Sequence, residues 1–151
     1  MILEEAIKTS HFSDETHKAT INVMYTAYWL KDHLSKAIKS NGITIEQYNV
    51  LRILRGKHPE KMCIKDIAGR MIEKSSNVPR IIDRLLIKKL VKRTTSKIDK
   101  RETLISITQN GLLLLDVTTK EITDVTNLVT GLSEEEAAML NTLLEKMRLK
   151  D

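Results

Sequence analysis

Apolar residues recur at steps of three and four along most of this 151-residue chain, a spacing that is typical of amphipathic helices. The pattern breaks at two stretches rich in Val, Ile and Thr, residues 91–98 and 102–108, which favour β-strands. With only two Pro and five Gly, the chain is a poor candidate for a turn-rich all-β fold. The expected fold class is therefore mainly α with a small β-hairpin.

Length and composition limit the number of domains and indicate whether the chain has membrane segments or disulfides. A chain of 151 residues can sustain one core, so we expect residues 1–151 to form a single domain. No apolar run approaches the ~20 residues that cross a bilayer, and residues 1–8 lack the basic start and long apolar stretch of a signal peptide. A single cysteine excludes an internal disulfide framework. We expect a cytoplasmic protein with no membrane partner and no cofactor.

The apolar spacing divides the chain into six expected helices. They cover residues 13–39, 44–55, 64–71, 76–90, 108–130 and 133–147. Thr44 with Gln47 and Ser133 with Glu136 have the spacing of capping boxes, and Thr108 can cap the fifth helix. The first helix is longer than a core of this size needs, which is typical of helices that pack against a second chain. We expect residues 13–40 and 108–150 to form a helical dimerisation region, and residues 44–107 a winged helix-turn-helix.

Positive charge is concentrated in residues 74–101. This segment holds ten Lys and Arg against two Asp, a net charge of +8. Because the whole chain carries +5, the other 123 residues carry −3. A basic block on an otherwise mildly acidic chain indicates a polyanionic partner.

The helices at 64–71 and 76–90, joined by a short break, have the outline of a helix-turn-helix. The second has an apolar stripe and, on another face, a polar row made of Asn77, Arg80, Arg84 and Lys88. Arg pairs with guanine and Asn with adenine in the major groove. The alternative is a solvated charged face with no partner.

The two expected strands flank the tripeptide Asp99-Lys100-Arg101. A basic hairpin after a helix-turn-helix makes a winged helix, and it would place Lys97, Lys100 and Arg101 beside the duplex, at the backbone or in the minor groove. Cations there contribute salt-sensitive affinity that is largely independent of sequence. Two cationic elements side by side favour double-stranded DNA as the partner.

This ordered set of features resembles the MarR family of bacterial winged-helix transcription regulators. The motifs that carry the resemblance are Arg80-x-x-Asp83-Arg84-Leu85, Asp99-Lys100-Arg101, Thr108-x-x-Gly111 and the helix opening Ser133-Glu-Glu-Glu136. The resemblance implies a homodimer joined through its terminal helices and bound to pseudo-palindromic promoter DNA.

The resemblance also implies roles for single residues. Ser75, Ser76 and Asn77 would begin the recognition helix, and Arg101 would lie at the tip of the wing, oriented by Asp83 and Asp99. The chain departs from the family in three ways: Pro79 stands where an N–H donor is usual, Lys89 stands where glycine usually precedes the first wing strand, and Lys88 with Lys89 adds more positive charge than recognition requires.

Four residues outside the basic segment have two interpretations each. Tyr25, Tyr28 and Trp29 line a candidate pocket for a small-molecule effector, or they are packing residues of the long first helix. Cys63, between Lys61 and Lys65, is a redox sensor or a small apolar residue at a helix start. Packing is the favoured interpretation in both cases.

The sequence offers no pattern that supports enzymatic activity. The four histidines are scattered, and neither a phosphate-binding Gly-rich loop nor a nucleophile elbow is present. We therefore expect no catalytic residues and no metal site. The leading hypothesis is a dimeric, sequence-specific DNA-binding regulator, an effector-responsive repressor; the alternatives are a winged-helix protein-interaction module and a non-specific architectural DNA binder.

Overall fold

The expectation of a mainly α-helical chain is confirmed. A computed structural model describes residues 1–9, 11–96 and 101–149, so Lys97, Asp99 and Lys100 lie outside the described residues. In chain order the elements are α1 (Leu3–Ile7), α2 (Glu15–Ala37), a 3₁₀ turn η1 (Lys39–Asn41), α3 (Ile45–Arg55), β1 (Met62–Cys63), α4 (Ile64–Arg70), α5 (Val78–Ile87), β2 (Val91–Thr95), β3 (Thr103–Ile107), α6 (Gln109–Thr130) and α7 (Glu134–Met147).

Helix starts were the most predictable boundaries. Thr44 and Ser133 both form complete capping boxes, in which each side chain accepts a hydrogen bond from the amide three residues on. Thr108 caps α6 by accepting from the Gly111 amide. Short polar side chains at these positions accept hydrogen bonds from amides that have no partner within the helix. Helix starts can therefore be predicted from the residue type at the cap.

The β-hairpin is part of a three-stranded antiparallel sheet with strand order β1-β3-β2. In the hairpin, Val91 pairs with Ile107 and Thr95 with Thr103. On the other edge of β3, Met62 pairs with Ile105. Strand β1 was not predicted, because two residues are too few to show a period.

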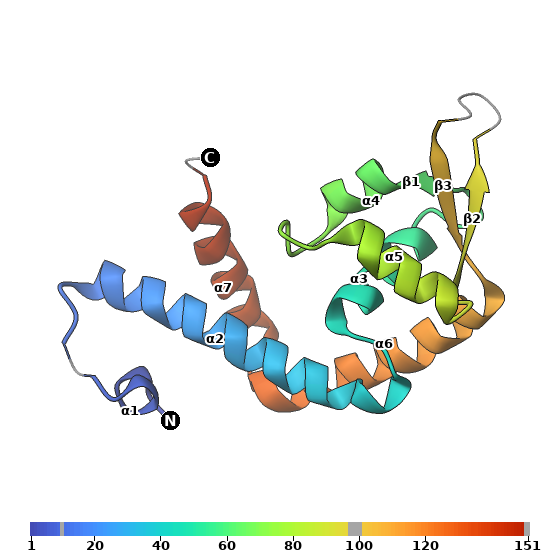
Figure 1. The fold of residues 1–151 in the computed structure, drawn as a ribbon. Helices are drawn as coiled ribbons and strands as arrows, with labels where there is room; N and C mark the ends of the chain where they lie inside the picture. The colour runs from blue at the N-terminus through green and yellow to red at the C-terminus, as the bar shows by residue number, and fades with distance from the viewer. Residues whose placement is uncertain (10, 97–100, 150–151) are drawn as a thin grey trace.

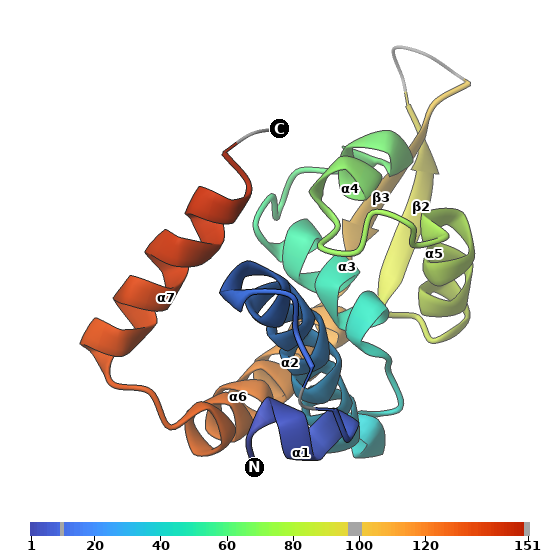
Figure 2. The same cartoon turned by 90° about the vertical axis from the view of Figure 1, so that its left-hand side faces the viewer.

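The core lies among α3, α4, α5, α6 and the sheet. Its fully buried members come from every one of these elements: Val50, Leu51, Leu54, Ile67, Ile82, Leu85, Ile105 and Leu115. By contrast, neither α2 nor α7 contains a buried residue. Figures 1 and 2 show α7 leaving the end of α6 and standing apart from the winged-helix elements. Within the described residues, no helix is both long and apolar enough to cross a bilayer.

The end of α5 explains how the chain tolerates Lys89 where glycine is usual. Lys89 has φ of 58°, in the left-handed region. Its amide donates to the Leu86 carbonyl, and the Leu90 amide donates to the Leu85 carbonyl. This pair of bonds is a Schellman motif, which ends a helix with a left-handed residue. The helix therefore ends as it would with glycine, but with a strained lysine.

Replacing Lys89 with glycine is expected to raise the free energy of unfolding by about 1 kcal/mol, because a residue without Cβ adopts the left-handed conformation without strain. Urea denaturation followed by circular dichroism measures the change. Lys88→Gly is the matched control. The backbone of Lys88, at the neighbouring position, has the right-handed helical conformation, so glycine there should destabilise the protein. Equal effects of the two substitutions would contradict the assignment of strain to Lys89.

Candidate nucleic-acid interface

Helix α5 buries one face and exposes two arginines on another. Its buried residues are Val78, Ile82 and Leu85. Arg80 and Arg84 are exposed, and within the described part of the chain their guanidinium groups have no hydrogen bond or ion pair. Unpaired guanidinium groups on a helix anchored by its apolar face are free to bind an anion.

The first turn of α5 accounts for Pro79. Asn77 is the N-cap, and its Oδ1 accepts a hydrogen bond from the Arg80 amide at 3.2 Å. Pro79 follows within the first turn, where amides have no partner in the helix, so the missing N–H costs little. The family departure at this position is therefore compatible with a regular helix.

The three residues expected at the start of the recognition helix have different surroundings. Helix α5 begins at Val78, later than expected, so all three precede it. Ser75 is exposed, and its hydroxyl lies 3.5 Å from a Glu73 carboxylate oxygen. The Ser76 hydroxyl is buried and has no hydrogen-bond partner among the described residues. Asn77 is exposed, but paired bonds to adenine need both atoms of its amide group, and Oδ1 already caps α5. In this structure Asn77 is a helix cap, and its expected contact with adenine stays a prediction.

An ion pair joins α5 to the wing. Asp83 Oδ1 lies 2.6 Å from the Arg93 guanidinium on β2, and both side chains are largely exposed. The resemblance implied that Asp83 orients Arg101, which is exposed next to β3, and Arg93 was not singled out from the sequence. Because the ion pair joins α5 to β2, it helps to fix the position of the helix relative to the first strand of the wing.

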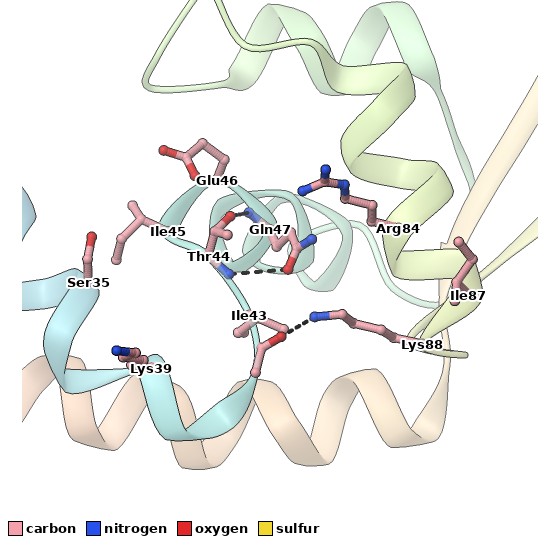
Figure 3. A pocket seen from close by; sticks show the side chains of 11 residues that line it. Ser35, Lys39, Ile43, Thr44, Ile45, Glu46, Gln47, Arg84, Ile87 and Lys88 are labelled. Carbon is pink, nitrogen blue, oxygen red and sulfur yellow. Dashed lines mark hydrogen bonds between the residues drawn. The ribbon is translucent and has the colours of Figure 1, made fainter.

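Lys88 leaves the polar row of α5. Its ammonium group donates a hydrogen bond to the Gly42 carbonyl, in the connection between η1 and α3. Figure 3 shows Lys88 extending from α5 toward this connection rather than away from the protein. In this DNA-free structure the ammonium group of Lys88 bonds within the protein, and its expected DNA contact stays a prediction.

A two-carboxylate ion pair holds the turn that leads into α5. Lys31 on α2 lies 2.9 Å from Glu46 at the start of α3, and 2.7 Å from Glu73 in the turn. The amide of Ile72, in the same turn, donates to the buried Asn49 side chain at 3.0 Å. The hydrogen bonds to Glu73 and Glu46 raise the pKa of Lys31. Burial raises the pKa of Glu46, but the bond from Lys31 and neighbouring bonds outweigh it, so that pKa is lowered from 4.5.

Replacing Lys31 with methionine is expected to reduce the free energy of unfolding at pH 7 by about 0.5–1 kcal/mol, because the side chains are partly exposed. The lowered pKa of Glu46 stabilises the folded state above pH 4.5, and this contribution is lost as the pH falls through the folded-state pKa. The raised pKa of Lys31 has the same origin, so its contribution is present at pH 6 and is lost with the charge of the two carboxylates at pH 3. The difference between wild type and Lys31→Met should therefore shrink between pH 6 and pH 3.

Urea denaturation at the two pH values measures this difference. Lys36→Met is the matched control, since among the described residues Lys36 pairs only with Asp32 on the same helix and both side chains are well exposed. A pH-independent effect of Lys31→Met would show that packing, and not the ion pair, is responsible.

The aromatic residues of α2 do not line the larger described cavity. Tyr25 and Trp29 are half-buried and Tyr28 is 75% exposed. The cavity, of about 570 Å³, lies instead where the end of α2, the start of α3 and α5 meet (Figure 3). Tyr25, Tyr28 and Trp29 therefore remain an untested effector prediction.

Cys63 contributes to local structure. It is half-buried and precedes α4 as its N-cap, where its Sγ accepts from the Asp66 amide at 3.4 Å. This arrangement favours the structural interpretation over the sensor.

The arrangement of α4, α5 and the β2-β3 hairpin, with unpaired arginines on α5, defines a winged-helix protein of the nucleic-acid-binding class. Residues 43–103 match the model of the MarR family. The transcriptional regulator MhqR of Bacillus subtilis (strain 168) is 28% identical over 121 residues, which cover 80% of this chain and 82% of MhqR. Over its winged-helix part and along most of its length, the chain is thus similar to the MarR family of transcriptional regulators.

Solved structures agree with this assignment. MepR of S. aureus, in complex with DNA, has a TM-score of 0.78 and 25% identity, and the match covers 87% of this chain and 97% of MepR. A MarR transcription factor from Planctomyces limnophilus has a TM-score of 0.70 and 29% identity, with 92% of this chain and 99% of that one covered.

Proposed function

We propose that this regulator binds double-stranded DNA as a homodimer in a sequence-specific manner, and that it is an effector-responsive repressor. The observation that carries the proposal is the pair of exposed, unpaired guanidinium groups of Arg80 and Arg84 on a helix whose opposite face is buried. Arg80 and Arg84 would read base edges in the major groove. Arg101 and the expected wing lysines, Lys97 and Lys100, would contact the backbone or the minor groove.

Exposed apolar side chains on the terminal helices support the dimer. Helices α2, α6 and α7 expose Val23, Met24, Tyr28, Leu113, Val117, Leu128, Met139, Leu140, Leu143 and Met147. Apolar surface gathered in this way on long helices is typical of a protein interface. A two-fold dimer built on these helices would present two copies of α5, and one turn of DNA separates the half-sites of such proteins by about 34 Å.

The test is a gel-shift titration against the DNA upstream of the chain's own gene, at two salt concentrations and with unrelated competitor DNA. Sequence-specific binding leaves a complex that resists competitor. An architectural binder gives a salt-sensitive complex that the competitor removes. A protein-interaction module gives no complex with either DNA, and this outcome would overturn the proposal.

A further inference from the structure

Lys31 links the long helix α2 to the turn that precedes α5. Its ammonium group lies 2.7 Å from Glu73 in that turn and 2.9 Å from Glu46 at the start of α3. Within the described part of the chain, the other ion pairs of α2 reach only Asp32 on α2 itself and Glu4 on α1. Figure 1 shows the turn between α4 and α5 on the side of the winged helix nearer to α2. Among the described residues, the Lys31–Glu73 pair is therefore the ion pair that joins α2 to the helix-turn-helix.

The turn that contains Glu73 is held on both sides and leads directly into α5. The Ile72 amide donates a hydrogen bond to the buried Asn49 of α3 at 3.0 Å. The Glu73 carbonyl accepts one from the Ser76 amide at 3.2 Å. Asn77, the next residue, is the N-cap of α5. A displacement of Glu73 relative to α2 would therefore displace the first turn of α5 as well.

Lys31 also shares a face of α2 with apolar residues that the proposed dimer would bury. Met24, Tyr28 and Lys31 are separated by steps of four and three residues, which places them along one side of the helix. Met24 is 56% exposed and Tyr28 is 75% exposed. A partner chain packed on this side would fix α2, and the ion pair would then fix the start of α5 relative to the partner.

We propose that Lys31 is a positioning residue that couples α2 to α5 and so sets the spacing of the DNA half-sites that the dimer accepts. This inference rests on the proposed binding of DNA by a homodimer. A duplex with the correct spacing meets both copies of α5 with the ion pair intact. A duplex with another spacing requires α5 to move relative to α2, which breaks the pair. Lys31 thereby contributes to specificity without contacting a base.

The test compares the affinities of the full chain for two duplexes, measured by fluorescence anisotropy. The first is the shortest fragment of DNA upstream of the chain's own gene that wild type binds, with its half-sites mapped by hydroxyl-radical footprinting. The second has one base pair inserted between the half-sites. Wild type should bind the second duplex about tenfold or more weakly, because the insertion moves one half-site along and around the helix axis. The ratio of the two affinities is the readout.

In Lys31→Met this ratio should fall, because the variant has no ion pair to break. The expected fall is about 2- to 30-fold, since an exposed ion pair contributes a factor of about 1.4 to 5 and the dimer contains two. Partial unfolding, or the loss of a direct phosphate contact, would weaken binding to both duplexes by the same factor and leave the ratio unchanged. Circular dichroism verifies that each variant folds.

Three further variants locate the effect. Lys31→Arg should keep the wild-type ratio, since a guanidinium group can bind both carboxylates. Glu73→Gln should lower the ratio as Lys31→Met does, and the double variant should lower it no further. Glu46→Gln is the matched control: it removes the other carboxylate, leaves the pair between Lys31 and Glu73 in place, and should retain the wild-type ratio.

A wild-type ratio in Lys31→Met would overturn the inference, and so would an equal fall of the ratio in Glu46→Gln and Glu73→Gln. Effects of Lys31→Met and Glu73→Gln that add in full would contradict it too, because the two residues would then act separately. If wild type binds no DNA, or binds both duplexes equally, the proposed function is wrong and this inference fails with it. A wild type that prefers the mapped spacing supports the proposed function whatever the variants do.

Discussion

Replacing Gly111 with alanine is expected to lower the free energy of unfolding by about 3 kcal/mol. A Cβ at this position would lie 2.3 Å from the Leu90 carbonyl oxygen and 2.7 Å from Ile107 Cγ1. The Ile107 side chain can rotate, but the Leu90 carbonyl belongs to the backbone and accepts a hydrogen bond from the Thr108 amide at 3.0 Å. Relieving the overlap must displace α6 from the end of α5, which places the cost at the upper end of the range for overpacking.

Urea denaturation measures this loss, and Gly69→Ala is the matched control. Gly69 lies in α4, and a Cβ built on it meets no atom within 4 Å. Alanine there should stabilise the protein by about 0.5–1 kcal/mol, because it is the better helix former. Destabilisation of similar size at both positions would contradict the packing argument for Gly111.

The Thr108-x-x-Gly111 motif shows why part of the fold was predictable. Thr108 accepts a hydrogen bond from the Gly111 amide and donates one to the Lys89 carbonyl at 2.9 Å. A cap, a helix start and a close backbone approach are all local, so a few residues specify them. The same applies to the capping boxes at Thr44 and Ser133.

Contacts between distant segments could not be predicted in this way. The charge row of α5 identified Lys88 as a DNA ligand, yet its ammonium group reaches Gly42, 46 residues away along the chain. Likewise Asp83 pairs with Arg93, because the strand register decides which cation of the hairpin faces α5. Helical periodicity gives the face of a side chain, but not the element that lies opposite it.

Asn77 illustrates a different limit. Its residue type suits both a helix cap and an adenine contact, and the adenine contact is the role predicted from the sequence. The spacing of Asn77 and Pro79 also fits an N-cap followed by proline in the first turn. That signal was present in the sequence, and the structure shows Asn77 as the cap.

Arg80→Ala and Arg84→Ala are each expected to cost about 1–3 kcal/mol in binding to the cognate duplex and to relax base preference. This corresponds to a loss of roughly 5- to 150-fold in affinity. The reason is that both guanidinium groups are exposed and unpaired in the described structure, so DNA binding breaks no existing ion pair. Arg52→Ala is the control: Arg52 belongs to α3 and lies over the Tyr48 ring, whose hydroxyl donates a hydrogen bond to Thr119 of α6.

Salt dependence separates base reading from phosphate binding. Each lost phosphate contact reduces the slope of log K against log salt concentration by about 0.9, whereas a lost base contact lowers affinity mainly for the cognate sequence. We expect both arginine variants to lose more affinity for the cognate duplex than for unrelated DNA, with Arg52→Ala unchanged on both. If Arg84→Ala kept wild-type affinity and base preference, Arg84 would have no role in the groove.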